Sequence, residues 1–209
     1  GLSLASDGDV ADPDEDDTLS VTGTLSDEDG CTGGCSLTYA WSNGATSSTI
    51  TLGQSDVGST ISVTLTYTDD QTESNSITLT AASDVDNVND SPTGSVTISG
   101  TPTEDQTLTA SNDLADEDGM GTVTYTWSNG ATGASIVLGQ SDVGNAITVT
   151  ASYDDAQGTT ESVASSATTA VANVNDAPTG SVTITGTAQE DETLTASNDL
   201  ADEDGMGTV

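Results

Sequence analysis

The feature of this 209-residue sequence that most constrains its fold is an internal repeat with a period of 86 residues. Residues 108–123 return without a change at 194–209, and the hexapeptide WSNGAT that begins at Trp41 returns at Trp127. Repetition at a fixed spacing indicates serial structural units, and each unit here has the size of a β-sandwich domain. The sequence predicts tandem repeats with the boundaries 1–88 for repeat 1, 89–174 for repeat 2 and 175–209 for a partial repeat 3.

Repeat 1 differs from the others at its front. It has a different opening segment and three extra residues between Gly30 and Trp41, in a loop that holds both cysteines. Partial repeat 3 contains only the part of the repeat that is expected to form two strands and the start of a third, which cannot close a sandwich alone. We expect the chain to be a piece of a longer polypeptide.

Within repeat 2 the apolar residues alternate with polar ones, as in half-buried strands. The clearest case is the series Ile147, Val149, Ala151 and Tyr153. Thr and Val dominate these segments, as strands prefer, and no window of comparable length has a helical period. The sequence predicts an all-β unit with strands around 96–98, 108–110, 123–127, 136–138, 147–153 and 163–171.

The chain contains no Lys, Arg or His, and its 35 Asp and Glu residues give a formal net charge of −35. Without cationic side chains we expect no binding to nucleic acid or to an anionic membrane surface, and no apolar run is long enough to insert into a membrane. Catalysis by a His base, a Schiff-base Lys or an Arg clamp is also excluded. We expect no enzyme, because the acidic residues recur with the repeat, whereas active sites usually do not.

The order of landmarks in repeat 2 resembles an immunoglobulin-like domain. Trp127 stands where the third strand of such a domain carries its buried Trp, and Asp142-Val143-Gly144 precedes a long strand as a D-x-G corner does. The linker Asn173-Val174-Asn175-Asp176-Ala177-Pro178 resembles the inter-repeat linker of cadherins. The whole unit resembles the cadherin-like tandem extender repeats of giant bacterial surface adhesins. This resemblance implies immunoglobulin-like β-sandwiches stacked end to end, with Trp41 and Trp127 as equivalent core residues.

In such a stack, acidic loops of two successive repeats and the linker between them meet at one junction. Carboxylates that meet without a cationic partner repel each other, and Ca²⁺ takes about six to eight oxygen ligands of the carboxylate, amide and carbonyl kinds. We therefore expect Ca²⁺ at the junctions. Mg²⁺ is less favoured because it keeps its waters, and Zn²⁺ lacks its His ligands.

The expected ligands follow from the topology. Between repeats 2 and 3 they are Glu104, Asp105, Asn173, Asn175, Asp176, Asp199, Asp202 and Asp204. Between repeats 1 and 2 they are Glu15, Asp16, Asn87, Asn89, Asp90, Asp113, Asp116 and Asp118. Asp142 and Asp154 are second-choice ligands, and the D-V-G pattern predicts that Asp142 caps its own corner instead.

Cys31 and Cys35 are the only cysteines and enclose Thr-Gly-Gly. The two glycines let the chain fold back far enough for a disulfide. The spacing is not that of a C-x-x-C redox pair. We predict a structural disulfide and hence an oxidising, extracellular location.

These features predict a structural, calcium-rigidified repeat region of an extracellular bacterial adhesin or surface fibre, acting as an elongated spacer. Its partners would be neighbouring repeats of the same or identical chains, with a cell-surface or matrix partner bound through other regions. One alternative is a subunit of a self-assembling filament that exchanges strands between chains. A carbohydrate- or ligand-binding module is a further alternative, although each repeat has a single Trp and few Tyr.

Overall fold

The structure, a computed structural model, describes residues 1–30 and 35–207. They form two compact units, Gly1–Ser91 and Pro92–Val209. Within the described ranges the fold is all-β, with several small antiparallel sheets, two short 3₁₀ turns and no α-helix. No helical segment of these residues is long and apolar enough to cross a membrane.

The first unit contains two three-stranded sheets. One has the strand order β1-β2-β4 and the other the order β3-β5-β6, and all pairs are antiparallel. The strands are β1 (Leu2–Ser6), β2 (Thr18–Gly23), β3 (Thr38–Trp41), β4 (Thr49–Thr51), β5 (Thr60–Thr68) and β6 (Ser74–Asp84). A 3₁₀ turn, η1 (Gln54–Asp56), precedes β5.

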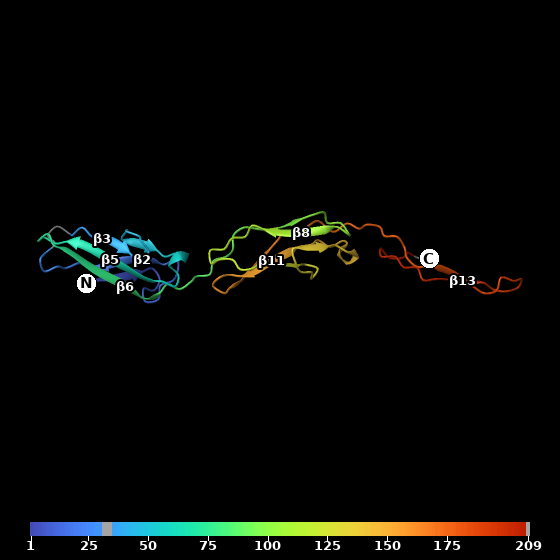
Figure 1. Cartoon of the computed structure of the whole chain (residues 1–209), viewed down its shortest axis with the longest axis horizontal. Coiled ribbons are helices and arrows are strands. Elements are labelled where there is room, and N and C mark those ends of the chain that lie inside the picture. The colour runs from blue at the N-terminus through green and yellow to red at the C-terminus, as the bar shows by residue number, and fades with distance from the viewer. Residues whose placement is uncertain (31–34, 208–209) are drawn as a thin grey trace. The chain divides into compact units, whose positions relative to one another are not determined.

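The second unit repeats this arrangement, with the sheets β10-β8-β7 and β12-β11-β9. Figure 1 shows β8 and β11, which belong to different sheets of this unit. The strands are β7 (Val96–Ser99), β8 (Thr107–Asn112), β9 (Thr124–Trp127), β10 (Ser135–Val137), β11 (Val149–Asp154) and β12 (Thr160–Ala164). The 3₁₀ turn η2 (Gln140–Asp142) occupies the place of η1.

Each unit has its own core, built from alternating residues of both sheets. In the second unit Leu108 of β8, Trp127 of β9 and Val149 of β11 belong to one cluster of buried side chains. Burial of this apolar surface is the main stabilising term. Trp127 also satisfies its polar atom, because the indole Nε1–H donates to the Gly133 carbonyl at 2.8 Å. Trp41 is buried in the first unit with an equivalent bond to Ser47, so the prediction that both Trp residues are core residues is confirmed.

The last strand of the second unit is shorter than the predicted segment 163–171. Regular pairing of β11 with β12 ends at Thr150↔Ala164. Beyond that point the Val149 N–H donates to Ser165 Oγ and the Ile147 N–H to Thr168 Oγ1, at 3.1 and 3.0 Å. Hydroxyl groups thus take the place of ladder carbonyls, which interrupts the regular strand.

Residues after the second core form a separate hairpin of β13 (Val182–Thr185) and β14 (Thr195–Asn198). It has the same register as β7–β8, because Val182 pairs with Asn198 as Val96 pairs with Asn112. Both strands of this hairpin are exposed along their whole length.

Candidate metal-binding site

Glu104 is a buried carboxylate beside the linker that follows β12. It lies in the turn between β7 and β8 and is 2 % exposed. A parallel bridge joins Thr103 to Ala172, and the Glu104 N–H donates to the Ala172 carbonyl at 2.9 Å. The carboxylate oxygen Oε2 accepts the Val174 N–H at 3.1 Å. The backbone therefore fixes this side chain against the linker.

Two further carboxylates meet Glu104 from later parts of the same unit. Asp176 lies in the linker, and Asp204 lies in the loop after β14. The Asp176 N–H donates to Asp204 Oδ2 at 2.8 Å, which ties this loop to the linker. One oxygen from each of Glu104, Asp176 and Asp204 lies within 4.8 Å of the others.

This group of three lacks an internal counter-charge, because the chain has no cationic side chain. Asp204 Oδ1 is buried and has no hydrogen-bond partner among the described residues. Leaving a buried carboxylate oxygen unpaired is costly, and three carboxylates at this spacing repel one another. The donor set consists of hard oxygen atoms, so a divalent cation such as Ca²⁺ would satisfy both requirements.

A second group of three lies within the first unit, where Asp27 and Asp29 follow β2 and Asp69 follows β5. One oxygen from each carboxylate lies within 4.8 Å of the others. Asp27 Oδ2 accepts the Tyr67 hydroxyl at 2.6 Å, and Asp27 Oδ1 accepts the Asp29 N–H at 3.0 Å. These two hydrogen bonds, the first the stronger, lower the pKa of Asp27.

We use the term loop end for two neighbouring acidic loops of one unit; among the described residues, only those of the first unit form a group of three by themselves. In the first unit these are residues 24–30 and 69–73, and in the second unit 113–123 and 155–159. The second loop end is joined by a bridge between Met120 and Asp155 and by the Ala156 N–H, which donates to the Asp118 carbonyl at 3.2 Å. Asp116 Oδ2 accepts the Tyr153 hydroxyl at 2.5 Å, as Asp27 does from Tyr67.

Other predicted ligands have structural partners. Asp113 Oδ1 accepts the Ser95 N–H and hydroxyl at 2.7 and 2.9 Å, and Asp199 binds Ser181 in the same way. The backbone bond is the main reason that the pKa of each carboxyl is lowered, followed by the hydroxyl bond. These two residues connect the two strands at one end of each hairpin by hydrogen bonds. They lie outside the groups of three.

The remaining predictions for the second unit are placed as follows. Asp202 Oδ1 accepts the Asp204 N–H at 3.0 Å and so shapes the loop of Asp204. Asn175 Nδ2 donates to the Asp176 carbonyl at 2.9 Å, and Asn173 precedes it in the linker. Asp105 is exposed with a φ of 62°, a left-handed conformation that Asp tolerates better than most residues.

In the first unit, Glu15 is buried and Asp16 is exposed with a φ of 67°, as for Glu104 and Asp105. The Glu15 N–H donates to the Asp86 carbonyl at 2.8 Å, beside a parallel bridge between Asp14 and Asp86. Asn87, Asn89 and Asp90 follow in the chain, and Asn89 Nδ2 donates to the Asp90 carbonyl at 3.3 Å. The predicted ligand set of this stretch stays a prediction.

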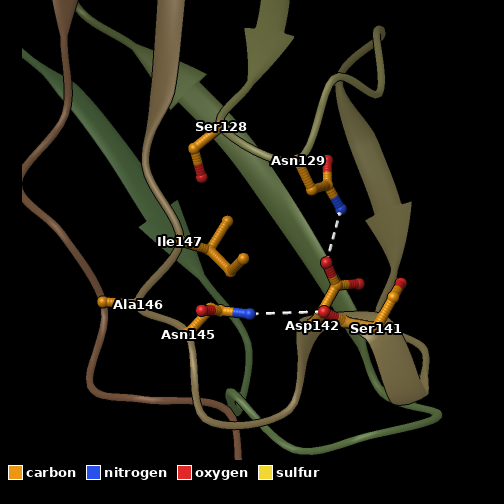
Figure 2. Close-up of a pocket in the computed structure, with 7 residues that line it drawn as sticks. All are labelled: Ser128, Asn129, Ser141, Asp142, Asn145, Ala146 and Ile147. Carbon is orange, nitrogen blue, oxygen red and sulfur yellow. Dashed lines mark hydrogen bonds between the residues drawn. The ribbon is translucent and has the colours of Figure 1, made fainter.

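Asp142 caps its own corner, as the D-V-G pattern predicts. Its Oδ2 accepts the Gly139 N–H at 3.1 Å, and its Oδ1 accepts Asn129 Nδ2 at 3.0 Å. Figure 2 shows this carboxylate on the wall of a shallow pocket that Asn145 and Ile147 also line. Because both oxygens are engaged, Asp142 has a structural role. The other second-choice ligand, Asp154, is exposed and accepts the Thr160 hydroxyl at 2.7 Å.

The predicted disulfide involves Cys31, which lies outside the described residues. Cys35 is described, and no described cysteine is free.

Sequence reasoning missed Asp69 and Asp155 as candidate ligands, although the strand pattern contains the signal. The buried positions Ile147, Val149, Ala151 and Tyr153 continue with the same alternation to Asp155. Asp155 lies at a position whose side chain faces the core, and a buried carboxylate needs a partner. It is therefore a stronger candidate for a metal ligand than its exposed neighbour Asp154.

No protein-family model matches the chain, and no curated protein shows a significant similarity to it.

Proposed function

We propose that this chain is a calcium-rigidified structural repeat region of an extracellular adhesin or surface fibre, acting as a spacer. The observation that carries the proposal is the group Glu104, Asp176 and Asp204, with its buried, unpaired Asp204 oxygen in a chain without cationic side chains. Its three members come from a turn, a linker and a later loop. A cation held there would join these three segments through their carboxylates.

The proposed fold of each repeat is an immunoglobulin-like β-sandwich with a period of 86 residues. Support comes from the strand orders β7-β8-β10 and β9-β11-β12, whose buried residues share one core that contains Trp127. The first unit has the same two orders around Trp41. We keep the boundaries 1–88, 89–174 and 175–209 for the repeats.

In the proposed mechanism Ca²⁺ replaces repulsion by attraction. Two carboxylate charges 4.8 Å apart repel by about 3 kcal/mol at an effective dielectric constant of about 20. Without the cation, these charges separate and the linker around Asp176 gains freedom. With the cation, Glu104 holds the linker and Asp204 holds the following loop. The core clusters contain none of these carboxylates, so each core should remain folded in both states.

Chelation tests this mechanism at the level of the whole chain. Removing Ca²⁺ should leave the β-sheet circular dichroism nearly unchanged, while small-angle scattering reports greater flexibility and protease cleaves near Asp176. The proposal is wrong if chelation changes neither the scattering profile nor the rate of cleavage.

A sharper test is Glu104→Gln, because Gln keeps the shape and can still accept the Val174 N–H but loses the charge. Calorimetry should show at least about a tenfold weaker Ca²⁺ affinity at one site, since ligand charge sets affinity in such sites. Asp105→Asn is the matched control: it removes an equal charge from the exposed neighbour and should have a clearly smaller effect. Equal effects of the two substitutions would show that only the overall charge matters.

A second candidate function is supported by the exposed hairpin β13–β14. Val182 and Ile184 of this hairpin and Leu194 beside it are exposed apolar residues. In a self-assembling filament these residues would be covered by strands of another chain. Concentration-dependent growth of particles in light scattering, abolished by Ile184→Asp, would favour this function over the spacer.

A further inference from the structure

The two loop ends differ at one strand position beside the carboxylates. Asn75 of β6 pairs with Tyr67, and Glu161 of β12 pairs with Tyr153, so the two residues occupy equivalent places in the two units. Tyr67 donates its hydroxyl to Asp27, and Tyr153 donates its hydroxyl to Asp116. Both units therefore have the tyrosine, but its cross-strand neighbour is an uncharged amide in the first unit and a carboxylic acid in the second.

This exchange alters the bonding of the buried Asp on the second loop. In the first unit Asp69 Oδ2 accepts Asn75 Nδ2 at 2.9 Å. In the second unit Glu161 has no donor to offer when ionised. Asp155 is only 7 % exposed, yet its Oδ2 is buried without a hydrogen-bond partner among the described residues. Its other oxygen accepts the Gln157 and Thr159 N–H groups, each within 2.9 Å.

The exchange also raises the negative charge around the second loop end. Glu161 pairs with Tyr153, whose hydroxyl donates to Asp116, so its carboxylate adds a charge in the strand next to this loop. At the equivalent place beside Tyr67 and Asp27, the first unit has the uncharged Asn75. The first unit does carry Asp70 and Glu73 in its loop, but both are exposed and lie outside its group of three.

We propose that the residue at this strand position sets the cation affinity of each loop end, so that Glu161 makes the second loop end the tighter site and Asn75 makes the first the weaker one. The inference rests on the proposed function, because it assumes a divalent cation with oxygen ligands. At the first loop end a cation must compete with the Asn75 amide for Asp69. At the second, Asp155 already presents a buried oxygen without a hydrogen-bond partner among the described residues, and Glu161 adds a further negative charge.

Reciprocal substitutions in the full chain test this inference. Glu161→Asn and Asn75→Glu each introduce the residue that the other unit carries, so both are compatible with the fold. Ca²⁺ is titrated while amide resonances are followed by NMR. The Gln157 and Thr159 amides report the second loop end, and the Gln71 and Glu73 amides, which donate to Asp69, report the first.

In the unsubstituted chain the Gln157 and Thr159 resonances should move at a Ca²⁺ concentration about tenfold lower than those of Gln71 and Glu73. Glu161→Asn should raise the midpoint of the second loop end about tenfold, and Asn75→Glu should lower that of the first. Asp154→Asn is the control, because it removes an exposed charge directly next to the same loop end. Equal midpoints at the two loop ends, or an equal shift with Asp154→Asn, would overturn the inference.

The failure of this inference can be told apart from the failure of the proposed function. If the Val174 and Asp176 amides respond to Ca²⁺ but the reciprocal substitutions leave the loop-end midpoints unchanged, only the role of position 161 is wrong. If none of these amides responds to Ca²⁺ at millimolar concentration, both proposals fail.

Discussion

The hairpins β7–β8 and β13–β14 have nearly the same sequence and the same register, yet their surroundings differ completely. Val96 is 5 % exposed and Val182 is 65 % exposed, while Leu108 is fully buried and Leu194 is 51 % exposed. Both hairpins have the same Asp–Ser hydrogen bond at one end, since Asp113 accepts the Ser95 N–H as Asp199 accepts the Ser181 N–H. Only the first is covered by a second sheet, β9-β11-β12.

This difference separates two kinds of interaction. The strand register and the Asp–Ser hydrogen bond are local interactions, because they need only the residues of the hairpin. Burial of the apolar face is not local, because it needs Trp127 and Val149 from the other sheet and Ile147, which precedes β11. Two strands alone are marginal in water, so most of the stability of β7–β8 comes from that cover. The following experiments change one kind of interaction at a time.

The largest effect on stability should come from truncating Trp127, the buried aromatic residue of the sheet that packs on β7–β8. Trp127→Ala deletes a buried aromatic residue and should destabilise the second unit by about 3–5 kcal/mol. Hydrogen exchange of the Leu108 and Ala110 amides would then become faster and approach that of β14. Trp41→Ala should act on the first unit and leave these amides protected. Unchanged exchange in Trp127→Ala would mean that β7–β8 is stable without its cover.

A pair of identical substitutions tests the comparison directly. Leu108→Ala leaves a cavity in the core and should cost about 2–5 kcal/mol. Leu194→Ala changes an exposed residue and should alter stability by less than about 0.5 kcal/mol. Urea unfolding of both variants measures the difference. Similar costs would show that something covers Leu194 in solution, as in the filament alternative.

The smallest effect concerns pH and should be equal in the two hairpins. Hydrogen bonds from Ser95 and Ser181 lower the pKa of Asp113 and Asp199 below the ordinary value of 3.8. The stabilisation is complete above pH 3.8 and is lost as the pH falls through the lowered folded-state pKa. The Ser95 and Ser181 amide resonances should therefore titrate together, below pH 3.8, and Asp113→Asn should abolish only the Ser95 transition. A Ser181 transition at clearly higher pH would show that the Asp–Ser hydrogen bond depends on packing against the second sheet.

The candidate site was predictable only where chain order brings residues together. The linker residue Asp176 and the turn residue Glu104 follow from the expected topology, and the structure brings them together with Asp204. Asp105 directly follows Glu104, and Asp199 precedes Asp204 by a few residues, yet neither belongs to this group. Asp105 is exposed and has a left-handed backbone conformation, and Asp199 accepts hydrogen bonds from Ser181. Composition cannot distinguish such neighbours, because the choice depends on which carboxylate a turn buries.

By itself the sequence determined the serial repeats, the alternation that makes each segment a strand, the burial of Trp41 and Trp127 and the lack of any cationic side chain beside its carboxylates. These follow from periodicity and charge, which are properties of the chain alone. Only the tertiary structure decided that Asp204, and not Asp199 or Asp202, joins Glu104 and Asp176, and that the buried Asp155 keeps an oxygen without a hydrogen-bond partner among the described residues. The physical reason is that burial and desolvation depend on what packs against a residue, and identical segments acquire different energies when one of them lacks its covering sheet.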